Sequence, residues 1–158
     1  MKFVKTDIEG VLTAELPINA DKRGWLIELF RSDSLPKDFS PAMSYISLTH
    51  PGVIRGPHEH KEQTDLIVFI GSSKFDLYLW DNREDSSTFG KNLIIKSDLE
   101  NSLAIIIPPG IVHGYKNISD SDGFAVNMPD KLYAGQNKEE IVDEIRYENN
   151  PDSPFRID

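Results

Sequence analysis

The chain has 158 residues, of which 39% are hydrophobic and 27% charged, as is typical of a globular protein with one core. Its formal net charge of −9 argues against nucleic acid polymers as partners, because their binding depends on neutralising phosphates. The absence of cysteine excludes disulfides and thiolate chemistry, and no stretch approaches the ~20 apolar residues of a membrane span.

The first residues, "MKFVKTDIEGVLTAEL", lack the apolar run of about 7–15 residues that marks a secretory signal. We therefore expect a cytoplasmic protein. A small phosphorylated ligand is compatible with the acidic chain, because a few local arginines can bind phosphate by paired hydrogen bonds.

Short apolar runs separated by turn residues follow one another along most of the chain. Each run has five to eight residues, the length of a strand rather than of a helix. The runs are residues 25–30, 43–49, 65–71, 74–81, 92–97, 103–110 and 124–128. In 74–81 the alternation predicts that Phe75, Leu77 and Leu79 share one face. Evenly spaced short strands predict an all-β sandwich or barrel, here one domain over residues 1–158.

Helical signals are sparse. The segment "NKEEIVDEI", residues 137–145, predicts one short helix, and residues 35–39 predict a single helical turn. The tail, residues 147–158, has no periodic pattern, and we expect it to run as a strap over the surface.

Three of the four histidines fall in two motifs about 50 residues apart. The first motif is His58-x-His60 followed by Asp65, and the second is "PPGIVHGYKN", which contains His113. Alternation predicts that His58 and His60 share one face of a strand, and the turn before His113 returns the chain toward them. Together they resemble the paired motifs of the cupin superfamily, which implies an all-β double-stranded β-helix, or jelly-roll barrel, with histidines in its mouth.

A narrower resemblance covers residues 21–152. Four segments are similar, in order and spacing, to motifs of the dTDP-4-dehydrorhamnose 3,5-epimerase family. They are "DKRGWLIELF" (21–30), "GVIRGPH" (52–58), "WDNREDSSTFGK" (80–91) and "IPPGIVHGY" (107–115). The resemblance implies an isomerase of polysaccharide biosynthesis that epimerises a nucleoside-diphosphate 4-keto-6-deoxy sugar without metal or cofactor.

The resemblance also implies roles for individual residues. His58 matches the catalytic base, and Arg55 matches an arginine that contacts the nucleotide phosphates. Arg23 and Glu28 match residues that one subunit lends to its partner's nucleotide site, so a homodimer is expected. Tyr133 matches a tyrosine that stacks on the nucleotide base.

Other family positions are not retained. The family lysine falls on Asp65, the tyrosine acid falls on Val126, and the aspartate that orients the base histidine falls on Asn150 or Asp152. We therefore expect another acid, and Tyr45, on the strand before His58, is the candidate.

The histidines His60 and His113 are expected to donate hydrogen bonds to the enolate oxygen, and Arg23 and Arg55 to hold the diphosphate. With Asp65 at the lysine position, the expected catalytic set is His58, Tyr45, His60, His113 and Asp65.

Three alternatives remain open on sequence grounds. Imidazoles with a carboxylate also suit a transition metal, whose ligands would be His58, His60, Asp65 and His113 in a metal-dependent isomerase or dioxygenase. "RGPHEHK" resembles the active strand of sugar 3,4-ketoisomerases. A cupin without the lost lysine and tyrosine is also compatible with a non-catalytic sugar-binding protein.

Overall fold

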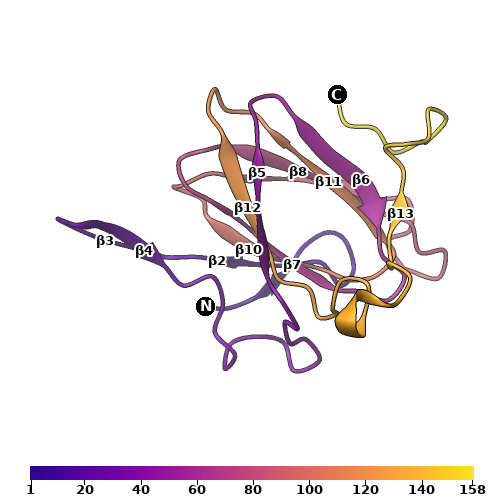
Figure 1. Cartoon of the computed structure of the whole chain (residues 1–158), viewed down its shortest axis with the longest axis horizontal. Coiled ribbons are helices and arrows are strands. Elements are labelled where there is room, and N and C mark those ends of the chain that lie inside the picture. Colours follow the sequence, from indigo (N-terminus) through magenta and orange to yellow (C-terminus); the bar gives the residue numbers. More distant parts are fainter.

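The protein is a two-sheet antiparallel β structure, described here by a computed structural model of residues 1–158 (Figure 1). One sheet has the order β1 (Val4–Lys5), β2 (Leu12–Glu15), β10 (Leu103–Ile107), β7 (Asp65–Ile70), β12 (Gly123–Asn127) and β5 (Tyr45–Thr49). The other has the order β13 (Ile145–Arg146), β6 (Ile54–Glu59), β11 (Ile111–Asn117), β8 (Phe75–Asp81) and β9 (Asn92–Ser97). The expected all-β jelly-roll fold is confirmed.

The core lies between the two sheets because alternate side chains of their strands point inward. Phe75, Leu77 and Leu79 of β8 are fully buried, as their alternation predicts. Across the barrel they meet Ile67 and Phe69 of β7, and the rings of Phe69 and Phe75 stack with centroids 4.5 Å apart.

A second apolar cluster covers the outer face of the six-stranded sheet. Leu66 and Val68 of β7 and Ile106 of β10 point outward into it, where Phe39 and Leu16 pack on them. The strands β7 and β10 are therefore buried on both faces, which explains their unbroken apolar sequences "LIVFI" and "LAIII".

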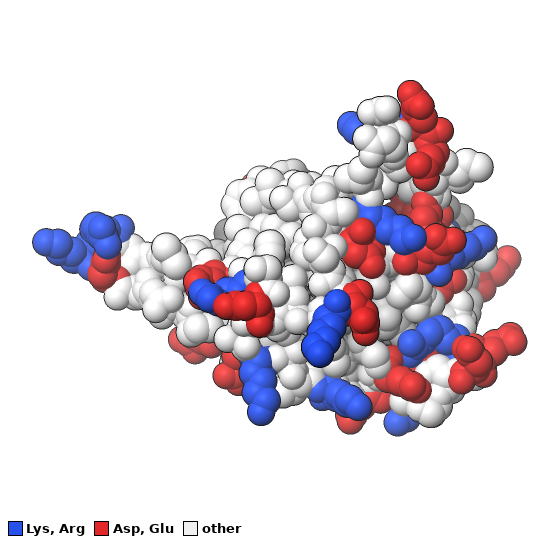
Figure 2. Space-filling view, turned by 90° about the horizontal axis from the view of Figure 1, so that it is seen from below, with Lys and Arg blue, Asp and Glu red and all other residues white.

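The strands β3 (Ile18–Asp21) and β4 (Gly24–Ile27) pair only with each other and form a hairpin that projects from the barrel (Figure 1). Figure 2 shows this arm at the left of the molecule, with basic side chains at its tip. The tip carries Lys22 and Arg23, and Trp25 and Leu26 remain largely exposed along the arm.

The predicted helix over residues 137–145 is wrong. Only Gln136–Lys138 form a 3₁₀ turn (η1), and there Asn137 and Lys138 adopt positive φ angles of 56° and 62°, which a continuing α-helix cannot accommodate. The chain then extends, and β13 joins β6, with Arg146 opposite His58. Residues 36–39 contain one turn, closed by the Phe39 amide donating to Pro36 O, but no helix.

The tail forms the expected strap over the outer face of the five-stranded sheet. The Tyr147 amide donates to Pro57 O at 2.9 Å, and the ring of Phe155 packs against Trp80 and Tyr147. No helix has the length and hydropathy needed to cross a membrane.

Candidate active site

A cavity of about 780 Å³ opens between the sheets at one end of the barrel, within the size range of small-molecule sites. His58, His60 and His113 line it from the five-stranded side, and Tyr45 and Asn127 line it from the six-stranded side. The two histidine motifs therefore meet in one site, as the sequence predicts.

Two glycines let β6 and β11 approach closely at this point. A Cβ atom on Gly56, which has φ +82°, would lie 2.8 Å from His113 O, and one on Gly114 would lie 2.8 Å from Arg55 O. His58 and His113 consequently sit directly opposite each other, with ring centroids 4.4 Å apart. Glu59, between His58 and His60, points to the other face and accepts a hydrogen bond from Tyr147 Oη at 2.7 Å.

The nearest carboxylate to His58 is one that the sequence did not indicate. Glu144 Oε1 lies 3.9 Å from His58 Nδ1, and Arg146 Nε donates to Glu144 Oε2 at 2.7 Å. Burial and the charges of His113 and His60 lower the pKa of His58 to about 2, so its ring is neutral near neutral pH.

The expected partners of His58, Asn150 and Asp152, do not reach it. Both are exposed in the strap, where the Asp152 amide donates to Asn150 Oδ1 at 3.0 Å. Glu144 was missed because residues 137–145 read as a helix, whereas the strand β13 brings this segment alongside β6.

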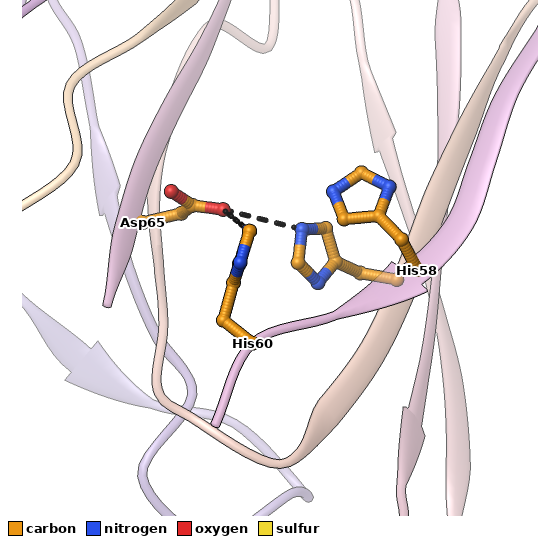
Figure 3. Close-up of side chains that lie close together, drawn as sticks. His58, His60 and Asp65 are labelled. Carbon is orange, nitrogen blue, oxygen red and sulfur yellow. Dashed lines mark ion pairs between the residues drawn. The ribbon is translucent and has the colours of Figure 1, made fainter. Parts of the chain in front are cut away.

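Asp65 projects from the start of β7 toward His60 and is fully buried (Figure 3). Its Oδ2 atom lies 3.3 Å from Nε2 of each histidine, and its Oδ1 atom accepts a hydrogen bond from Gln63 Nε2 at 2.9 Å. Burial opposes the charge of Asp65, but both histidines hold its pKa below the usual range.

The ring nitrogens of His60 and His113 are turned toward the protein. His60 Nδ1 contacts Asp143 O, and His113 Nδ1 lies 3.0 Å from Ile111 O. Since both Nε2 atoms face Asp65, no ring N–H points into the cavity, and the predicted hydrogen bonds to an enolate oxygen are not supported.

Tyr45 reaches the cavity from the edge strand β5. Asn127 Nδ2 donates to its Oη atom at 2.7 Å, and burial together with the charge of Asp65 raises its pKa to about 12. Val126 does not lie in the site: it packs into the outer cluster, while its neighbours Ala125 and Asn127 face the cavity. The side chain at position 126 therefore points away from the cavity, as strand alternation requires.

The predicted nucleotide-binding residues are dispersed in the single chain. Arg55 and Tyr133 line the cavity, but Arg55 donates to Thr49 Oγ1 at 3.0 Å and to Leu48 O at 2.7 Å. Arg23 pairs with Asp21 at the tip of the projecting arm, and Glu28 pairs with Arg31. Neither Arg23 nor Glu28 lines the cavity of its own chain.

The fold and the site define a cupin-type barrel with histidines, a tyrosine and buried carboxylates around its mouth. The family model described as dTDP-4-dehydrorhamnose 3,5-epimerase matches residues 5–146. A probable low-salt glycan biosynthesis epimerase, Agl13 of Haloferax volcanii, is 38% identical over 135 residues, 85% of this chain and 86% of that protein.

Solved structures share the fold. A dTDP sugar isomerase from Desulfovibrio desulfuricans G20 superposes with a TM-score of 0.81, 23% identity and coverage of 94% of this chain and 91% of that one. ChmJ, a 3'-monoepimerase from Streptomyces bikiniensis in complex with dTDP-quinovose, has a TM-score of 0.73, 28% identity and coverage of 82% and 68%. The chain belongs to the dTDP-4-dehydrorhamnose 3,5-epimerase family.

Proposed function

We propose that the protein is a nucleotide-sugar epimerase that acts on a nucleoside-diphosphate 4-keto-6-deoxy sugar. The observation that carries the proposal is His58, a neutral imidazole in the cavity of a member of this epimerase family. A carbon beside a ketone is acidic enough to lose a proton to such a base, because the enolate spreads the charge onto oxygen.

His58 is the proposed base. The pKa of His58 is low before reaction. The ring becomes more basic as negative charge develops on the enolate, because the enolate stabilises the imidazolium by ion pairing. Glu144, 3.9 Å from Nδ1, is the group placed to stabilise that imidazolium from the opposite side of the ring.

Tyr45 is the proposed acid. Inversion requires that the new proton arrive on the sugar face opposite the base, and Tyr45 belongs to the sheet opposite that of His58. Its raised pKa keeps the phenol protonated, and Asn127 fixes its oxygen.

The nucleotide is proposed to bind at the rim, with Tyr133 against the base and Arg55 near the diphosphate. Arg23 and Glu28 require a partner subunit, and the projecting arm that carries Arg23 is suited to crossing to one. We propose a homodimer in which each arm completes the other subunit's site.

The test is solvent exchange and product NMR with a dTDP-linked 4-keto-6-deoxyglucose in deuterated buffer. Wild-type protein should incorporate deuterium beside the ketone and invert at least one of those carbons. His58→Asn should reduce both by about 10²-fold or more. The control is His50→Asn, at an exposed histidine paired with Asp122, and should change neither rate.

Three outcomes would contradict the proposal. Undiminished exchange in His58→Asn would remove the proposed base. A product whose ketone has moved to the neighbouring carbon would identify a 3,4-ketoisomerase, and tight binding without exchange or product would identify a sugar-binding protein.

A further inference from the structure

One buried acceptor in the cavity has no hydrogen-bond donor in the chain. Asn127 lines the cavity and is only 8% exposed, and its Oδ1 atom is buried without a partner. Its other amide atom, Nδ2, donates to Tyr45 Oη at 2.7 Å. Buried carbonyl oxygens are almost always paired, because an unpaired one loses the hydrogen bonds that water would supply. The missing donor therefore points to a group that enters the cavity from outside the chain.

The neighbours of Asn127 do not supply this donor. On one side β12 pairs with β7, and the residue opposite Asn127 is Ile67, whose side chain is a hydrocarbon. On the other side the residue opposite is Tyr45, whose oxygen already accepts from Nδ2. The next inward residue of β12 is Ala125, which is also apolar. The side that remains open to Oδ1 is the cavity itself.

The contact with Asn127 also fixes the direction of the Tyr45 proton. A phenol has one O–H donor, and its oxygen here accepts the amide hydrogen. The proton of Tyr45 is therefore free for a substrate, as an acid requires. The two side chains present a donor and an acceptor side by side. Since the two amide atoms are about 2.3 Å apart, the acceptor Oδ1 lies within about 5 Å of Tyr45 Oη.

The two carbons beside the ketone of a 4-keto-6-deoxy sugar differ in the donors around them. C3 carries a hydroxyl group and adjoins C2, which carries another. C5 carries a methyl group and the ring oxygen, and neither of these donates a hydrogen bond. An acid that acts on C5 would bring these two groups next to Asn127 Oδ1 and leave it unpaired. An acid that acts on C3 would bring a hydroxyl donor within reach of Oδ1.

We infer that Asn127 Oδ1 accepts a hydrogen bond from a hydroxyl group on the C2–C3 edge of the sugar, so that Tyr45 reprotonates C3. This assignment rests on the proposed epimerase function and adds to it the carbon that is inverted. His58 takes the proton from C3, and the electron pair of that C–H bond forms the enolate. Tyr45 returns a proton to the opposite face, and the imidazolium and phenolate that result are restored by proton exchange with solvent.

The first experiment follows the wild-type chain and dTDP-linked 4-keto-6-deoxyglucose in deuterated buffer by NMR, carbon by carbon. We expect inversion and deuterium uptake at C3, with uptake at C5 slower by at least about 100-fold. Equal rates at both carbons, or inversion at C5 alone, would overturn the assignment of C3 and leave the epimerase function standing. Exchange at neither carbon would refute both.

The second experiment measures the binding of substrate analogues that lack one hydroxyl group. The wild-type chain should bind the 2-deoxy or the 3-deoxy analogue about 10–100-fold more weakly than the parent sugar nucleotide. Asn127→Leu should bind that analogue and the parent equally, because the acceptor is gone. Wild-type affinity that is unchanged for both analogues would overturn the proposed hydrogen bond, whether or not Asn127→Leu folds.

Two controls separate the acceptor from folding of the chain. Asn127→Leu should bind dTDP, which lacks the hexose, with wild-type affinity. Asn92→Leu, the same substitution at an exposed asparagine of β9 outside the cavity, should leave every measurement unchanged.

Asn127→Asp separates the acceptor from the contact with Tyr45. The carboxylate keeps an acceptor for the sugar but has no hydrogen to donate to Tyr45 Oη. KM should therefore stay near the wild-type value, while kcat falls by about 10-fold or more. A KM for Asn127→Asp as high as that of Asn127→Leu would show that the amide only supports Tyr45, and would overturn its contact with the sugar.

Discussion

At the residue scale, the three histidines of the cavity have two different kinds of surroundings. His58 has a neutral ring that faces Glu144, whereas His60 and His113 are tied to carbonyl oxygens and to Asp65. Burial opposes protonation of His60, but Asp65 raises its pKa overall. Only His58 is therefore in a position to take a proton from a substrate.

The first residue-scale prediction concerns Tyr45→Phe, which removes the hydroxyl that Asn127 contacts and keeps the ring. If Tyr45 supplies the second proton, exchange into the starting sugar should persist because His58 still acts, while net inversion falls by about 10²–10⁴-fold. Parallel measurement of deuterium uptake and product by NMR distinguishes the two steps. Unchanged inversion would show that Tyr45 only packs.

The second prediction concerns Glu144→Gln, which removes the charge nearest His58 and keeps the side-chain shape. Because Glu144 acts by positioning His58, the substitution should lower kcat by on the order of 10²-fold and leave KM nearly unchanged. Glu144→Asp should restore part of the rate. Steady-state kinetics would refute this role if KM changed and kcat did not.

At the scale of elements, the hairpin between β8 and β9 is held by one buried carboxylate. Asp81 accepts hydrogen bonds from Arg83 Nη2 at 2.8 Å and from Ser86 Oγ at 2.6 Å. Arg83 Nη2 also donates a hydrogen bond to the backbone oxygen of Glu9 at 2.6 Å. This network explains the "DNREDSSTFGK" motif as a structural tie between the hairpin and the N-terminal segment. None of these residues lines the cavity.

Asp81→Asn should lower the free energy of unfolding by about 3 kcal/mol at neutral pH. Burial opposes the charge, but Arg83, Ser86 and Thr88 hold the pKa of Asp81 well below its usual range. The stabilisation is therefore complete above the unfolded pKa near ~4 and is lost as the pH falls toward the folded value.

Urea unfolding between about pH 2 and 7 measures this effect. The wild-type and Asp81→Asn curves should converge in acid. Asp120→Asn, at an exposed aspartate, should follow the wild type at every pH. A constant difference between wild type and Asp81→Asn down to the lowest pH would contradict the role of ionised Asp81.

At the scale of the whole molecule, one chain has surfaces typical of an incomplete assembly. The arm exposes Trp25 and Leu26, and the edge strand β5 exposes Ile46 and Leu48 on its outer face. Unpaired edges and exposed apolar residues of this kind favour association. The proposed dimer would cover them and bring Arg23 to a partner's cavity.

Arg23→Ala should weaken binding of dTDP by about 10–10²-fold, since a charged hydrogen bond contributes about 1.5–3 kcal/mol. Calorimetric titration measures the affinity for dTDP, and Lys37→Ala, at an exposed lysine, is the control. Sedimentation should show a dimer at micromolar concentration. A monomer with full affinity would refute the arrangement.

Mixed dimers test whether Arg23 acts across the interface. Arg23→Ala and His58→Asn chains, refolded together, should recover about a quarter of wild-type activity at low substrate, because half of the dimers contain one intact site. No recovery would indicate that Arg23 serves its own chain.

The sequence by itself determined the fold class and the meeting of the two histidine motifs. Short alternating strands with turn residues between them specify a β barrel, and Phe75, Leu77 and Leu79 occupy the core as their spacing requires. The order of the four motifs indicated the family. Two of these motifs contain Gly56 and Gly114, where only glycine fits because β6 and β11 approach closely.

Only the tertiary structure decided which groups surround His58. Glu144 reaches it through the pairing of β13 with β6, 86 positions along the chain, and local propensity favoured a helix there instead. Val126 faces away from the cavity because the register of β12 against β7 sets which of its side chains point inward. Likewise, the contacts of His60 Nδ1 with Asp143 O and of His113 Nε2 with Asp65 are long-range interactions that no local pattern encodes.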